Sequence, residues 1–124
     1  MSVIVRDDGF HAEDYTGDRA LYIAEDTAPE ALPDDFAGIE MIRVAFPSFA
    51  DGRGFTLARQ IRGRGYAGRL RATGHVIADQ YAMARRAGFD EVEIPDDLAA
   101  RQPEAQWMFR ADWQDHDYRS RLKA

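Results

Sequence analysis

Four polar residues that could do chemistry follow three apolar, strand-like segments of the sequence. They are Asp51, Arg53, His75 and Asp96. An imidazole with an ordinary pKa of about 6.5 can take up or release a proton near neutral pH, and a carboxylate can share that work. The sequence therefore offers His75 and Asp51 as candidate catalytic residues.

A guanidinium next to glycines at a predicted helix start suggests a second kind of chemistry. The residues concerned are Gly52, Arg53, Gly54 and Arg59. Unpaired N–H groups at the beginning of a helix, with an arginine beside them, favour the binding of an oxyanion. The same pattern is also typical of a helix capped by Asp51 and a turn made by glycines, and His75 is also typical of a cap or a surface residue. Both interpretations stay open at this point.

Three further residues would support such a site. They are Asp79, Gln80 and Asp96. Asp79 and Gln80 fall inside a predicted helix, where we expect them to bond to neighbouring backbone or to an arginine, with Arg53 one conceivable partner of Asp79. Asp96 stands where it could cap a short helical turn.

These residues can meet only if the elements that precede them are neighbours. Hydrophobic periodicity predicts strands at 40–46, 69–73 and 92–94, and helices at about 55–62 and 76–87. This alternation over residues 40–94 is typical of two consecutive βαβ units, and hence of an α/β fold with a mainly parallel sheet. Ligands bind at the carboxyl ends of parallel strands, so such a fold would place the candidate residues along one edge.

The rest of the chain is expected to complete a single domain over residues 1–124. Its parts are a core at 40–95, N-terminal strands at 1–38, and a C-terminal helix and tail at 96–124. Apolar residues on both sides of an Asp-Asp-Gly turn at 7–9 predict an N-terminal hairpin. Another strand is expected at 21–24.

The C-terminal region carries aromatic residues on a predicted helix at 103–113. We expect Trp107 and Trp113 to pack on the domain itself, and a contact with a second subunit is the alternative. The polar segment at 116–121 is expected to be frayed or held by a partner.

Charge is segregated along the chain. Residues 1–51 carry three Arg and twelve acids, residues 52–89 carry eight Arg and one Asp, and residues 90–124 carry five Lys or Arg and nine acids. Arginine binds carboxylates and oxyanions through a planar fork of donors, so the middle block predicts a surface for an acidic partner or an anion. The alternative is that the acidic flanks fold over the middle and neutralise it. The net charge of −6 argues against nucleic acid as a partner.

Several classes of protein are disfavoured. A chain without cysteine has no disulfide, thiol nucleophile or cysteine-ligated cluster. No stretch approaches the ~20 apolar residues of a membrane span, and no signal peptide opens the chain, so we expect a cytoplasmic protein without membrane contact. The histidines are scattered, so no metal site is expected. The string G-x-G-x-x-G at 63–68 follows a predicted helix instead of a strand, which argues against a dinucleotide, and no cofactor is expected.

One set of residues carries a likeness to a known family. The set is Phe46-Pro47, Asp51-Gly52-Arg53-Gly54-Phe55, Ala58-Arg59, Arg62, Gly65-Tyr66, Gly68-Arg69-Leu70-Arg71-Ala72, Gly74, Asp79-Gln80 and Gly88-Phe89-Asp90. In these residues the chain resembles the bacterial family of domain of unknown function 934, over roughly residues 40–95. At the position after Gly74 the family often has Asp, whereas this chain has His75.

The resemblance implies a place in reductive sulfur assimilation, because members of that family are typically encoded beside assimilatory sulfite or nitrite reductase components. We therefore expect an accessory protein that docks a reductase component through its Arg-rich central surface. On this view it is not itself a catalyst, and any activity would be associated with an oxidoreductase. The alternative is a small enzyme that binds an oxyanion or a phosphorylated metabolite at the carboxyl edge of the sheet. A homodimer is also compatible with the sequence.

Overall fold

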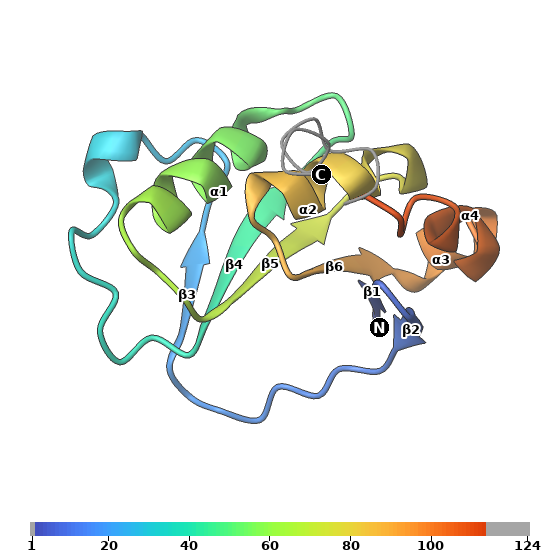
Figure 1. The fold of residues 1–124 in the computed structure, drawn as a ribbon, viewed down its shortest axis with the longest axis horizontal. Coiled ribbons are helices and arrows are strands. Elements are labelled where there is room, and N and C mark those ends of the chain that lie inside the picture. Colours follow the sequence, from blue (N-terminus) through green and yellow to red (C-terminus); the bar gives the residue numbers. More distant parts are fainter. Residues whose placement is uncertain (1, 114–124) are drawn as a thin grey trace, which may run out of the picture.

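Six strands form one mixed sheet in the order β2-β1-β6-β5-β4-β3 (Figure 1). The computed structural model describes residues 2–113. The strands are β1 (Ser2–Arg6), β2 (Gly9–His11), β3 (Ala20–Ile23), β4 (Met41–Phe46), β5 (Arg69–Gly74) and β6 (Glu91–Pro95). The helices are α1 (Arg53–Gly63), α2 (Tyr81–Ala87), α3 (Asp96–Arg101) and α4 (Glu104–Met108), with short 3-10 helices η1 (Pro29–Ala31) and η2 (Ala78–Gln80).

The two predicted βαβ units are present. β4, α1, β5, α2 and β6 follow one another in the chain, and the three strands pair in parallel. β3 adds a fourth parallel strand beside β4. β1 pairs antiparallel with β6 and forms the predicted hairpin with β2. The chain is therefore an α/β domain with a mainly parallel sheet, as the sequence predicts.

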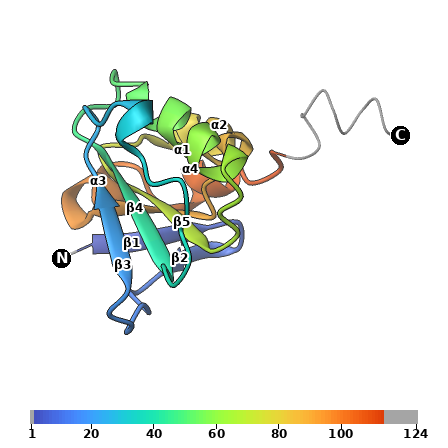
Figure 2. The same cartoon turned by 90° about the vertical axis from the view of Figure 1, so that its left-hand side faces the viewer.

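Helices α1 and α2 lie next to each other over one face of the sheet (Figures 1 and 2). α1 forms there because Phe55, Ala58 and Ile61 recur at helical spacing and are all buried. Beneath the helices, the ring of Phe46 lies 5.0 Å from that of Phe55 and 5.7 Å from that of Phe89, measured between centroids. We call this apolar side the helix face.

The opposite side of the sheet carries charged side chains at alternate strand positions, and we call it the charged face. Register places Arg43 of β4 beside Arg71 of β5, and Arg71 beside Glu91 of β6. Directly paired residues point to the same side of a sheet, so these three side chains share one face. The segment at 12–19 supplies Glu13 and Asp14, which bond to the arginines of this face.

Two predicted helices differ from the observed ones. The helix expected over 76–87 starts as the 3-10 helix η2 and becomes regular only at Tyr81, because the N–H groups of Gln80 and Tyr81 bond to carbonyls three residues earlier. The helix expected over 103–113 ends at Met108, because the N–H groups of Arg110 and Ala111 bond back to carbonyls only three residues earlier.

Other expectations for the C-terminal region have mixed outcomes. Asp96 is the first residue of α3 and not its cap, because Pro95 holds the cap position. Trp107 is fully buried, with its ring 6.1 Å from that of Tyr81, so it packs on the domain as predicted. The expectation for 116–121 lies outside the described residues.

Within residues 2–113, no helix combines the length and the apolar character that crossing a membrane requires.

Candidate functional site

The connections that follow β4 and β5 are tied together at the carboxyl edge of the parallel strands. The N–H of His75 donates to the carbonyl oxygen of Phe46 at 2.8 Å, and the Gln80 amide donates to that of Phe49 at 2.7 Å. Gly74 permits the first contact, because its φ is +126° and an added Cβ would lie 2.3 Å from the Phe46 oxygen. The segments that carry the two candidate catalytic residues therefore meet at one edge.

Asp51 is paired with Arg53. Its carboxylate accepts the Arg53 N–H at 3.1 Å and the guanidinium at 2.6 to 3.2 Å. The hydrogen bonds from Arg53 hold the pKa of the Asp51 carboxyl at about 2. Glu25 and Asp26 line the same hollow as Arg53. An anion placed at Arg53 would therefore meet three carboxylates, and Asp51 also fixes the start of α1.

The other residues predicted to bind an anion lie around the start of α1 and along it. An added Cβ on Gly54 would lie 2.4 Å from the ring of Phe46, so the glycine allows α1 to pack closely on β4. Gly52 holds the cap position of α1 and has no neighbour within 4 Å of where a Cβ would be. Arg59 is exposed on α1 and forms no hydrogen bond or ion pair within residues 2–113. Within residues 2–113, no hydrogen bond or ion pair joins His75 to Arg53 or to these three residues.

His75 lines a different hollow, which we call the edge hollow. It has a volume of about 370 Å³ and is lined by Phe49, His75, Ile77, Leu98, Arg101 and Gln102. These residues follow the carboxyl ends of β4, β5 and β6, which is the edge where open α/β sheets bind ligands. Of the predicted residues, only His75 lines this hollow. The sequence reasoning missed Phe49, Arg101 and Gln102.

The three supporting residues have different partners. Gln80 bonds to neighbouring backbone, as expected, and joins η2 to the β4–α1 connection. Asp79 pairs with Arg110 at 3.2 Å, so the conceivable pair with Arg53 is not formed. Asp96 is exposed in the first turn of α3.

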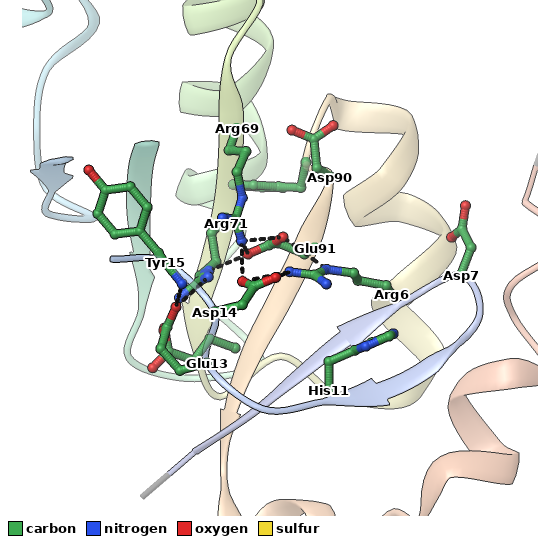
Figure 3. Close-up of polar contacts among 12 residues, drawn as sticks. Arg6, Asp7, His11, Glu13, Asp14, Tyr15, Arg69, Arg71, Asp90 and Glu91 are labelled. Atoms are coloured by element: carbon green, nitrogen blue, oxygen red, sulfur yellow. Dashed lines mark hydrogen bonds and ion pairs between the residues drawn. The ribbon is translucent and has the colours of Figure 1, made fainter. Parts of the chain in front are cut away.

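The charged face holds a network of eight side chains, which we call the charged layer. Figure 3 shows the part of it around Arg71 and Glu91. The members of the layer are Arg6, Arg43, Arg69, Arg71, Glu13, Asp14, Glu91 and Glu93. Arg71 is the centre, since its guanidinium has no exposed surface and bonds to Glu13, to Glu91 at 2.5 Å and to Glu93 at 3.0 Å. Four cations and four anions cancel within the layer.

Contacts within the charged layer shift the pKa values of several of its members toward their ionised forms. Burial alone would lower the pKa of Arg71, but its hydrogen bonds with Glu13 and the nearby charge of Glu91 raise that pKa overall. Hydrogen bonds from Arg71 lower the pKa of Glu13 to about 2. Hydrogen bonds from Arg6 and Arg69 lower the pKa of Asp14 to about 2. At neutral pH the layer is a set of charges that already have partners.

The other arginines of the basic block are also engaged within the domain. Arg62 donates to the carbonyls of Gly88, Tyr66 and Gly68 and pairs with Asp90 at 3.0 Å. Within residues 2–113, seven of the eight arginines of the block have such contacts, which leaves Arg59 as the exception. The seven are Arg53, Arg62, Arg64, Arg69, Arg71, Arg85 and Arg86. The acidic flanks thus fold over the basic middle, which is the alternative interpretation of the charge pattern.

A further surface lies between α2 and the turn after α4. Of its residues the sequence reasoning named only Trp113, as a residue that packs on the domain or contacts a second subunit. Met83 and Phe109 are 48% and 74% exposed and line one hollow of about 450 Å³. Arg86, Arg110 and Trp113 line it as well. We call these five residues the α2–α4 surface. Aromatic, methionine and arginine side chains are the types enriched at protein interfaces.

Comparison with known proteins places the chain in a family. A family model described as a bacterial protein of unknown function (DUF934) matches residues 20–121. The chain belongs to this family. The match extends the expected likeness at 40–95 across β3 and the C-terminal helices, and so includes the edge hollow and the α2–α4 surface. No curated protein and no solved structure matches the chain.

Metal-ligating side chains are dispersed in the described part of the chain. No three His, Cys, Asp or Glu side chains among residues 2–113 gather as ligands of one ion. The edge hollow offers a histidine and an arginine beside apolar side chains, and the α2–α4 surface offers exposed apolar side chains.

Proposed function

We propose that this chain is an accessory protein of assimilatory sulfite reduction that docks a reductase component. The place in sulfur assimilation rests on the expectation that members of the family are encoded beside sulfite or nitrite reductase components. The docking rests on one structural observation, which is the pair of exposed apolar side chains, Met83 and Phe109, in a hollow that charged side chains of both signs also line. Exposed apolar patches rimmed by polar residues are typical of protein interaction sites.

The Arg-rich middle of the chain contributes less to this docking than its sequence suggests. Most of its arginines already bond to carboxylates or carbonyls of the same domain. An arginine that is already paired gives little further attraction to an acidic partner, because binding must first break the existing pair. Arg86 is the member of the block that lies on the α2–α4 surface, where it donates to the carbonyl of Trp113 at 3.0 Å.

The test is the affinity of the purified chain for a purified sulfite reductase component, measured by isothermal titration calorimetry. We expect Phe109→Ser to weaken binding by about tenfold or more, because buried aromatic anchors carry much of the binding energy of an interface. Phe49→Ser is the matched control, since Phe49 is 58% exposed but lies at the carboxyl edge of the sheet. The control should bind like the unchanged protein.

Salt provides a second measurement on the same pair of proteins. If apolar contacts dominate, raising the salt concentration from about 0.1 M to about 0.5 M should change the affinity little, because salt screens only the charged contacts. A loss of binding at high salt together with an unaffected Phe109→Ser variant would contradict docking by the α2–α4 surface. That result would favour an arginine surface instead.

A further inference from the structure

The edge hollow has walls that are held in place from two sides. Gln80 accepts the N–H of Ile77 and donates to the carbonyl of Phe49, so it fixes the wall made by the β4–α1 connection. Gln102 accepts the N–H of Ala78 at 2.7 Å, and this bond fixes the end of α3 against η2. The two glutamines therefore fix the β4–α1 connection, the segment at η2 and the end of α3 relative to one another.

Apolar side chains line part of the hollow. Leu98 is 6% exposed, Ile77 is half-buried, and Phe49 is 58% exposed. A large exposed aromatic ring beside apolar neighbours can cover the flat or apolar part of a small molecule. The Phe49 ring therefore has a physical use here that its exposure alone would not explain.

Two side chains of the hollow can bind an anionic group. They are the guanidinium of Arg101 and the imidazole of His75. The pair of Arg101 with Asp97 is long, at 3.6 Å, and the two side chains are 69% and 76% exposed. By contrast, Arg53 is held by Asp51 at 2.6 Å. Binding a ligand would therefore break a weaker ion pair at Arg101 than at Arg53.

From this juxtaposition we infer that the edge hollow binds a small organic oxyanion, a phosphate or sulfonate group that carries a flat apolar part. Arg101 and His75 hold the oxyanion, since a guanidinium matches tetrahedral oxyanions through paired donors. Phe49 covers the apolar part. The volume of about 370 Å³ suits a molecule of this size. The inference moves the expected anion site from Arg53 to Arg101, and it is independent of docking by the α2–α4 surface.

The experiment is a titration of the full chain with phenyl phosphate and benzenesulfonate, followed by NMR of the His75 ring and by calorimetry. Inorganic phosphate and phenol are titrated separately, because each represents one half of phenyl phosphate. We expect a Kd in about the millimolar range for at least one whole ligand, since small ligands gain little energy in total. Each half alone should bind at least about fivefold more weakly, because either the arginine or the aromatic contact is then missing.

Variants assign the binding to the hollow. Arg101→Gln should weaken binding by about tenfold, and Phe49→Ala should reduce the affinity for phenyl phosphate to that for inorganic phosphate. Arg53→Gln is the matched control, because Arg53 is a similarly exposed arginine of the same edge. Phe109→Ser, which tests docking, should leave this binding unchanged.

Three outcomes would overturn the inference. They are the absence of binding by both whole ligands, an undiminished affinity of Arg101→Gln, and a loss caused by Arg53→Gln instead. The difference between phenyl phosphate and benzenesulfonate identifies which oxyanion the hollow prefers. All variants change exposed residues, so thermal unfolding should confirm that each one remains folded.

Discussion

The two faces of the sheet are covered in opposite ways. The helix face is covered by α1 and α2 through apolar side chains, with rings such as those of Phe46, Phe55 and Phe89 in contact. The charged face is covered by a network of ion pairs, with Arg71 fully buried at its centre. Sheets with parallel strands usually need cover on both faces, and here the second cover is ionic.

This difference separates stability from specificity. Apolar burial adds free energy roughly in proportion to the area removed from water. Buried ion pairs gain attraction but lose hydration, so their net contribution is small, although the removal of one partner is costly. The charged layer therefore fixes where the segment at 12–19 lies more than it stabilises the fold. It also explains why an Arg-rich sequence block does not become an Arg-rich surface.

The largest effect is expected on the helix face. Phe46→Ala should lower the free energy of unfolding by about 3 to 5 kcal/mol, because it removes a buried ring and leaves a cavity between α1 and the sheet. Urea denaturation measures the change. A loss below about 1 kcal/mol would show that this face is not the main source of stability.

The next effect is expected from breaking the charged layer at its centre. Arg71→Met should cost about 3 kcal/mol in urea denaturation, since Glu91, with 2% of its surface exposed, loses one of its partners. The double variant Arg71→Met with Glu91→Met should be more stable than the single variant, because no buried charge then loses its partner. A double variant less stable than the single one would mean that the layer is a net source of stability.

A smaller effect distinguishes two arginines of α1. Arg62→Gln should lower the free energy of unfolding by about 2 kcal/mol, because three backbone carbonyls and Asp90 lose a charged donor. Arg59→Gln is the matched control on the same helix and should change stability by less than about 0.5 kcal/mol. Equal losses in the two variants would contradict the division of the block into engaged and exposed arginines.

The smallest effect is expected from acid. Glu13 and Asp14 have pKa values of about 2 in the folded chain, against 4.5 and 3.8 as ordinary values. Lowered pKa values mean that their contribution is present above about pH 4.5 and is lost as the pH falls toward 2. The effect is modest because 38% and 50% of the two side chains are exposed.

A series of thermal unfolding midpoints from about pH 6 to about pH 2.5 follows this loss. In Arg71→Met the fall should be shallower, because Glu13 has lost the hydrogen bonds that lower its pKa. Parallel curves for the two proteins would contradict the assignment of this acid sensitivity to the charged layer.

The sequence predicts the βαβ units well because their signal is local. The apolar spacing of α1 and the alternation in β5 can both be read without knowledge of the rest of the fold. Strand order also follows in part, since βαβ units are right-handed and place consecutive strands side by side. The placement of β1 beside β6 is not predictable in this way, because it depends on residues about 90 positions apart in the chain.

The candidate site is less predictable because it depends on pairing. The sequence shows Arg53 next to glycines, but not that Asp51 already holds its guanidinium. Arg101 and Phe49 have no motif around them, and they become neighbours of His75 only when α3 folds against η2. One signal was available for the charged layer. Arg69 and Arg71 alternate on one predicted strand, and Glu91 and Glu93 alternate at the start of another, which is a pattern that favours charge pairs between strands.

Amide hydrogen exchange of the chain with and without a purified sulfite reductase component tests most directly which surface meets the partner. We expect the partner to slow exchange in α2 and in the turn after α4, around Met83 and Phe109. Exchange in β5 and in the segment at 12–19 should stay unchanged, because the arginines there are bonded within the domain. Slowed exchange over the charged face, with none at α2, would contradict the division of roles between the two faces.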